Sequence, residues 1–132
     1  MAVFRAKSDC DFDKLVHLIR TEFPNYGGIS VTVEEKADIA DGNSRCSVTA
    51  FERFSYMGSN RVGLTVTVFT GGETVHVVAV ATGGSQAVFL KLNTFGEEAF
   101  MDKFRDFLRE SIARCKSSAP KRRPDDDSPF EI

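Results

Sequence analysis

The chain has 132 residues, a formal net charge of −2, and a composition that is 42% apolar and 27% charged. A chain of this size and composition is expected to form one globular domain, with enough buried surface to fold without a metal ion. The balance of charge excludes an overall basic field for nucleic acid, and no run approaches the roughly 18 apolar residues needed to cross a membrane.

The first elements are predicted to be a short strand and a helix. Residues 1–6 alternate weakly, which is typical of a strand. Ser8, Asp9 and Asp11 are all good helix N-caps, and apolar residues at helical spacing follow from Phe12 to Phe23. Pro24 and a Gly-Gly pair then end this helix.

Alternating apolar and polar residues dominate the middle of the chain, and they predict a series of strands. The predicted strands cover residues 29–34, 45–57, 62–68, 74–82 and 87–92. Short glycine-containing turns separate most of them, among them Asp41-Gly42-Asn43 and Gly71-Gly72. Connections this short predict antiparallel pairing, because parallel strands need long crossovers.

The last helix is predicted to start at a capping box formed by Thr94 and Glu97, and an apolar stripe runs from Phe100 to Cys115. From Lys116 the chain is polar, with a basic block followed by an acidic one. We therefore expect a single α+β domain over residues 1–115. We expect a solvated tail over residues 116–132, in which a basic block precedes an acidic block.

These elements give the order β-α-β-β-β-β-β-α. The fold class expected is α+β, with an antiparallel five- to six-stranded sheet and two helices on one face, because each helix has one apolar side. This arrangement of helices and strands resembles helix-grip and TATA-binding-like folds. A likeness of architecture does not indicate function.

The side of the sheet away from the helices is predicted to be apolar. If the residues from Val62 to Val68 face the helices, then Phe69 faces away, and alternation in the other strands places Phe51 and Phe89 on the same outer side, with Val78 and Val80. An exposed apolar patch marks an interface or a ligand groove. The alternative is a β-bulge that turns some of these residues into the core.

A second candidate site is a group of arginines near one hairpin. Arg45, Arg53 and Arg61 are predicted to lie there with Tyr56 and Asn60. Arginine binds a carboxylate or phosphate through two parallel hydrogen bonds, so the group could hold an anion. The alternative is a set of solvated charges at the end of a hairpin.

No pattern in the sequence indicates catalysis, a metal ion or a cofactor. The G-x-S-x-G and H-E-x-x-H motifs are missing, and the Gly83-Gly84 turn is predicted to lead into a strand instead of a helix that could bind phosphate. The three cysteines, Cys10, Cys46 and Cys115, favour free thiols, with Cys46 inert in the core. With no signal-peptide pattern at the start, we expect a cytoplasmic protein.

Two stretches of the chain resemble an uncharacterised family of small bacterial proteins. They are RCSVTAFERFSYMGSNRVGLTVTVF and VATGGSQAVFLKLNTFGEEAF, and the likeness extends over about residues 1 to 115. The resemblance implies an α+β domain. It implies no activity, because that family has no established catalytic or binding residues to transfer.

The sequence therefore favours a non-catalytic binding or assembly module that self-associates through an apolar sheet face or an edge strand. The alternative is a binder of a small apolar or acidic ligand, with a pocket between the C-terminal helix and the sheet. Neither hypothesis involves nucleic acid or a membrane. A filled core favours the first, and a cavity of several hundred Å3 favours the second, in the usual range for ligand sites.

Overall fold

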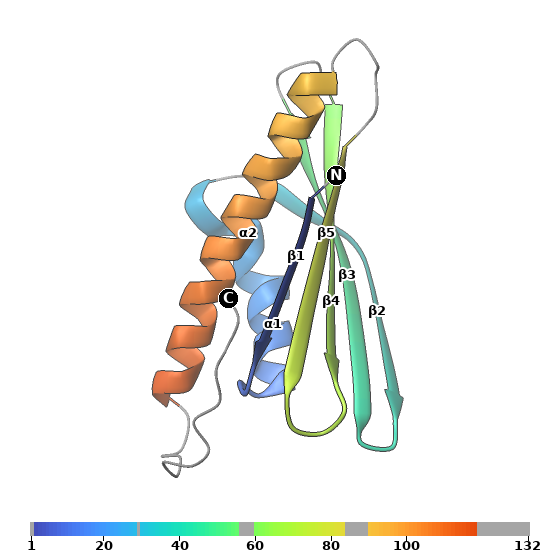
Figure 1. The fold of residues 1–132 in the computed structure, drawn as a ribbon, viewed down its shortest axis with the longest axis vertical. Coiled ribbons are helices and arrows are strands. Elements are labelled where there is room, and N and C mark those ends of the chain that lie inside the picture. Colours follow the sequence, from blue (N-terminus) through green and yellow to red (C-terminus); the bar gives the residue numbers. More distant parts are fainter. Residues whose placement is uncertain (1, 29, 56–59, 84–89, 119–132) are drawn as a thin grey trace.

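A computed structural model of the chain describes residues 2–28, 30–55, 60–83 and 90–118 (Figure 1). The elements in chain order are β1 (Ala2–Ser8), α1 (Phe12–Glu22), the 3-10 segment η1 (Phe23–Gly28), β2 (Val31–Asp41), β3 (Ser44–Ser55), β4 (Asn60–Thr70), β5 (Val75–Gly83) and α2 (Leu90–Ser118). The predicted α+β class, antiparallel sheet and two helices are confirmed. The sheet has five strands, the lower number of the predicted range.

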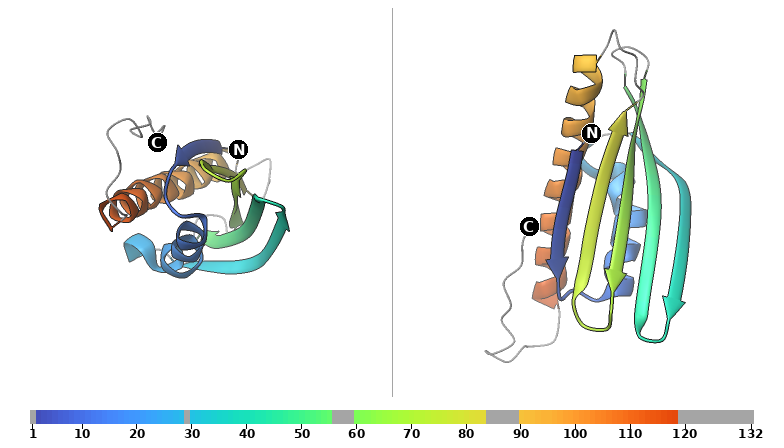
Figure 2. Two further views of the ribbon diagram at one scale, coloured as in Figure 1. Left: turned by 90° about the horizontal axis from the view of Figure 1, so that it is seen from below. Right: turned by 45° about the vertical axis from the view of Figure 1, so that its right-hand side comes forward.

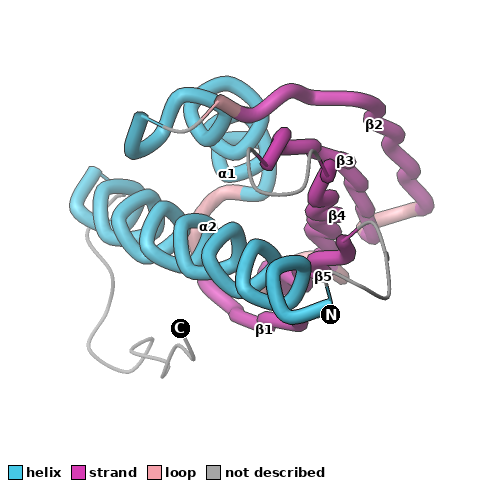
Figure 3. The backbone as a smooth tube through the Cα atoms, turned by 90° about the horizontal axis from the view of Figure 1, so that it is seen from above, coloured by secondary structure: helices cyan, strands magenta, loops and turns pink. Residues whose placement is uncertain are grey.

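The strands lie in the order β1-β5-β4-β3-β2, and every neighbouring pair is antiparallel. After β1 the chain crosses to the opposite edge of the sheet through α1 and η1, and it then returns by three consecutive antiparallel connections. Both helices lie on the same side of the sheet, with α2 alongside β1 and β5 (Figures 2 and 3). The domain therefore has two layers, and β4 is the central strand.

Local signals in the sequence account for the ends of several elements. The carboxylate of Asp11 accepts a hydrogen bond from the backbone N–H of Lys14 at 2.9 Å, so Asp11 is the one of the three candidate residues that caps α1. Gly42, with φ of 60°, lies in the turn between β2 and β3. A register shift between Val33 and Glu35 marks a β-bulge in the edge strand β2.

The core lies between the helices and the sheet, and aromatic rings fill it. Phe23 is completely buried, and its ring centroid lies 5.2 Å from that of Phe51 and 5.2 Å from that of Phe104. Phe100 and Phe104 of α2 are also completely buried, against the inward residues of β4 and β5. The space between α2 and the sheet is packed with side chains in the described residues. This packing removes the support for a ligand pocket there.

The start of the last helix differs from the prediction. α2 begins at Leu90, so Leu90 to Leu92 are helical and the strand predicted over residues 87–92 is wrong for these three residues. The rest of that segment lies outside the described residues. Thr94 is inside the helix and therefore cannot be its N-cap. At the other end α2 continues to Ser118, past the domain end predicted at Cys115.

The expectation of three free thiols is wrong. Cys10 and Cys115 form a disulfide that joins the connection between β1 and α1 to the end of α2. The two cysteines are 105 residues apart in the sequence, so no spacing rule indicates the pair. Cys46 is the free cysteine, and it is partly exposed instead of lying in the core.

Candidate functional site

The side of the sheet opposite the helices, called the outer face here, is the candidate site. In each strand its residues alternate with the buried ones, and directly opposite residues of paired strands share a face. The register places ten apolar or cysteine side chains on it. These are Val3, Ala37, Ile39, Cys46, Val48, Ala50, Phe54, Phe69, Val78 and Val80.

Large apolar side chains on the outer face are exposed to solvent. The exposed fractions are 68% for Ile39, 59% for Phe54, 52% for Val3 and 43% for Phe69. A fifth large apolar residue, Val33, is 38% exposed, but it is paired with Phe51 and so lies on the helix side. Four of the five exposed large apolar residues in the described parts of the chain therefore gather on one face. A patch of this kind marks an interaction surface.

One row of the outer face crosses the whole sheet. Phe69 of the central strand is opposite His76 on one side and Cys46 on the other, and Cys46 is in turn opposite Ile39. The rings of Phe69 and His76 lie 6.3 Å apart, centroid to centroid. Lys7 completes the row on β1. The apolar patch is therefore continuous across β4, β3 and β2.

Charged residues of opposite sign lie at the two edges of the outer face. β1 contributes Arg5 and Lys7, which are both cationic, and β2 contributes Glu35 and Asp41, which are both anionic. Each edge can therefore attract the other edge of a second copy. The charges also limit unspecific aggregation of an otherwise apolar sheet face.

The structure confirms part of the predicted outer face and corrects the rest. Phe69, Val78 and Val80 lie where the alternation placed them. Phe51 does not. It is directly opposite Leu64, only 1% of it is exposed, and its ring packs against Phe23 in the core. Phe89 lies outside the described residues. The cause is that β3 has apolar residues on both faces. Cys46, Val48 and Ala50 lie outside and Phe51 lies inside, so alternation alone does not show which face is buried.

The predicted arginine group does not converge in the described residues. Arg45 is opposite Thr70, at the far end of β3 from the hairpin that joins β3 to β4. Arg53 is opposite Val62 and so belongs to the helix side, whereas Arg61 lies on the outer face and forms an ion pair with Glu52 at 2.6 Å. Asn60 is the first residue of β4, and Tyr56 lies outside the described residues.

Arg45 has a structural partner instead of an open anion site. Its guanidinium binds the carboxylate of Asp13 through two hydrogen bonds, one of them 2.8 Å long, and it lies 4.5 Å from the centroid of the Phe12 ring. The hydrogen bonds from Arg45 hold the pKa of Asp13 below its ordinary value. Arg45 therefore fastens the start of α1 to β3.

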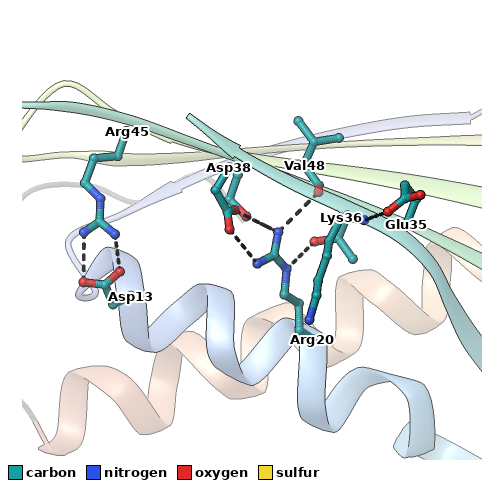
Figure 4. A network of polar contacts seen from close by, with 9 residues as sticks. Asp13, Arg20, Glu35, Lys36, Asp38, Arg45 and Val48 are labelled. Carbon is teal, nitrogen blue, oxygen red and sulfur yellow. Dashed lines mark hydrogen bonds and ion pairs between the residues drawn. The ribbon is translucent and has the colours of Figure 1, made fainter. Parts of the chain in front are cut away.

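Sequence reasoning missed a second arginine, Arg20, which links the last turn of α1 to β2 and β3 (Figure 4). Its Nε donates to Thr49 Oγ1 at 2.8 Å, and its Nη2 donates to Ser47 Oγ at 2.8 Å and to Asp38 Oδ1 at 3.0 Å. Both hydroxyl residues are buried, and the pKa of Asp38 is lowered, chiefly by its hydrogen bond to Arg20. The sequence signal that could have indicated this contact is the pair of polar residues, Ser47 and Thr49, at inward positions of β3.

An open cleft of about 450 Å3 lies between α1 and β2, above Phe12 and Val16. Arg20 and Arg45 line it, and both are already bonded to carboxylates. These two arginines are therefore already engaged within the fold. In the parts of the chain that the structure describes, no three His, Cys, Asp or Glu residues form a group able to hold a metal ion. Within the same residues, no helix is both long and apolar enough to cross a membrane.

Comparison with known proteins identifies the family. A family profile described as "Family of unknown function (DUF6054)" matches residues 1–112. The chain belongs to this family. The match confirms the resemblance to an uncharacterised family, and it carries no information about bacterial origin. No curated protein matches the chain, and no solved structure matches it either.

Proposed function

We propose that this chain forms a single domain that acts as a non-catalytic assembly module, forming a homodimer through the outer face of its sheet. The observation that carries the proposal is the gathering of Val3, Ile39, Phe54 and Phe69 on that face. The apolar surface of such side chains gains about 25 cal/mol for each Å2 removed from water. A second copy offers the same apolar surface and therefore fits it.

The size of the face suits a dimer. The five strands are 7 to 12 residues long, and with a spacing of about 4.8 Å between strands and a rise of about 3.3 Å per residue the sheet covers roughly 800 Å2. Each partner in a standard protein interface also contributes roughly 800 Å2. The outer face is thus large enough in area to support stable association.

The edge charges favour one of two symmetric arrangements. A two-fold axis parallel to β4 places β1 of one copy over β2 of the other, so Arg5 and Lys7 approach Glu35 and Asp41 of the second copy. An axis perpendicular to the strands would instead place β1 over β1 and bring like charges together. The first arrangement is therefore the one proposed, and it places Phe69, near the end of the central strand, close to the two-fold axis.

The proposal is tested by measuring molar mass with light scattering during size-exclusion chromatography, over a series of concentrations. We expect the wild-type chain to be a dimer, and we expect Phe69→Asp to weaken the dimer by about 100-fold or more, because a charge replaces a large apolar side chain close to the two-fold axis. Val33→Asp is the matched control, since Val33 is exposed on the helix side. A monomeric wild type, or a dimer that survives Phe69→Asp, contradicts the proposal.

Reversing the charges at the sheet edges tests the proposed orientation of the two copies. The double variant Arg5→Glu/Lys7→Glu should weaken the dimer, and adding Glu35→Lys and Asp41→Lys should restore it. Cys46 provides a second measurement, because it lies on the proposed interface and is the free cysteine. Its alkylation should slow as the wild-type chain is concentrated, and it should not slow in Phe69→Asp.

The protein is also proposed to be cytoplasmic. Fractionation of cells that produce the natural protein tests this directly. Recovery outside the cytoplasmic fraction would contradict it.

A further inference from the structure

The Cys10–Cys115 pair connects two parts of the domain that are far apart in the sequence. Cys10 lies between β1 and α1, and Cys115 lies near the end of α2, 105 residues later. Both residues are only 3% exposed. Their disulfide therefore ties the end of the last helix to the beginning of the fold.

The noncovalent contacts described near the end of α2 include one buried side chain and polar contacts at the surface. Ile112 is buried, and it anchors the turn before Cys115. Arg114 forms an ion pair with Glu22 at 2.7 Å, but both side chains are about half exposed, and a pair of this kind contributes little. The hydrogen bond from Tyr26 to Glu110, 2.6 Å long, lies more than one turn earlier. Without the disulfide, the helix after Ile112 loses its covalent link to the beginning of the fold.

A cleft gives small molecules a route to the pair. It has a volume of about 540 Å3, and both Cys10 and Cys115 line it, with Lys14 and Glu73 at its rim. A volume of a few hundred Å3 suits a small ligand. Because both cysteines are only slightly exposed, we expect small thiols and disulfides to reach them more readily than a folded redox protein.

We infer that Cys10 and Cys115 form a reversible modification site, at which small thiols and disulfides of the glutathione class release or fasten the end of α2. For release, the thiolate of one small thiol attacks a sulfur of the protein disulfide. The S–S bond breaks, a mixed disulfide forms, and the other cysteine leaves as a thiolate and takes up a proton. A second small thiol then attacks the mixed disulfide and frees the first cysteine.

The exchange balances in atoms and electrons. Two small thiols lose two electrons and two protons and become one small disulfide, while the protein disulfide gains both and becomes two thiols. The reverse sequence, with the small disulfide as oxidant, fastens the helix again. The inference is independent of the proposed dimer, because the outer face lies on the other side of the sheet from both helices (Figure 3).

The test uses the full-length Cys46→Ser chain, so that two cysteines remain. The protein is equilibrated without denaturant in mixtures of reduced and oxidised glutathione, the thiols are blocked, and intact mass measures the fraction of disulfide. We expect this fraction to change from nearly complete to nearly absent across the series while circular dichroism stays native. A disulfide that never forms, or one that exchanges only in denaturant, overturns the inference.

Limited trypsin cleavage measures the release of the helix. Cleavage after Arg114 should be about tenfold faster or more in the reduced protein, because proteolysis follows the population of the open form. Cys10→Ser and Cys115→Ser should be cut at the reduced rate in every mixture, while Cys46→Ser should follow the wild type. Equal rates of cleavage in the oxidised and reduced proteins would overturn the inference that the Cys10–Cys115 disulfide holds the end of α2.

Discussion

Replacing Arg20 tests the polar network that joins α1 to the sheet. The Arg20 side chain is 14% exposed, and it donates to Thr49 Oγ1 and to Ser47 Oγ, whose residues are 2% and 1% exposed. Arg20→Met keeps most of the aliphatic stem and removes both bonds. The two hydroxyl groups are then left in a buried position without their charged donor.

The expected cost follows from these two bonds. A hydrogen bond to a charged group contributes about 1.5–3 kcal/mol, and part of each loss is recovered if a hydroxyl finds a new partner. We therefore expect Arg20→Met to lower the free energy of unfolding by about 2–4 kcal/mol. For a domain of this size that corresponds to a fall of roughly 8–15 °C in melting temperature.

The assay is urea denaturation followed by circular dichroism, with Asp38→Ala as the matched control. Asp38 is 65% exposed, so its ion pair with Arg20 should contribute only about 0–1 kcal/mol. A double-mutant cycle with Thr49→Val should show coupling between Arg20 and Thr49. The reasoning is refuted if Arg20→Met costs no more than Asp38→Ala, or if the cycle shows no coupling.

Three further predictions concern the core, the disulfide and an ionisable tyrosine. Phe51→Ala should lower the free energy of unfolding by about 3–5 kcal/mol, as for other buried phenylalanines, whereas Phe69→Ala should change it by less than about 1 kcal/mol; equal effects in urea denaturation would argue against the assigned faces. Removing the disulfide by Cys115→Ala should lower stability in oxidising buffer by up to about 4 kcal/mol, since the crosslink closes a long loop, and Cys46→Ser should leave it unchanged; a melting temperature insensitive to reducing agent would contradict this. The hydrogen bond to Glu110 raises the pKa of Tyr26 to about 12, so this contact stabilises the fold fully below about pH 10, the pKa of unfolded tyrosine, and the contribution is lost as the pH rises through 12. Absorbance titration in a Tyr56→Phe background should show the high midpoint, and Glu110→Gln should return it to about 10; a midpoint near 10 without Glu110→Gln would show that the contact is not made in solution.

The outer face and the disulfide give the domain two separable properties. The outer face combines exposed apolar residues with opposite charges at the two sheet edges, which suits association with a second copy. The disulfide lies on the helix side and is proposed to control how firmly the end of α2 is held. Variants of Phe69 and of Cys115 should therefore change assembly and helix release independently.

Local patterns in the sequence were sufficient for much of the fold. The cap at Asp11, the turn at Gly42 and the alternation from Val62 to Val68 each depend on neighbours a few residues away, and each is confirmed. The start of α2 was misplaced because the apolar run before it is compatible with a strand or a buried helix. Thr94 and Glu97 fit a capping box in sequence, although the helix begins earlier.

The sequence by itself thus determined the fold class, the antiparallel pairing and most element boundaries, because periodicity and turn chemistry are local properties. Only the tertiary structure decided that Phe51 is in the core, that Arg45 binds Asp13 and that Cys10 reaches Cys115. The last two contacts join residues 32 and 105 positions apart. They depend on strand register and on helix placement, which are set by the packing of the whole domain and not by any short segment of the chain.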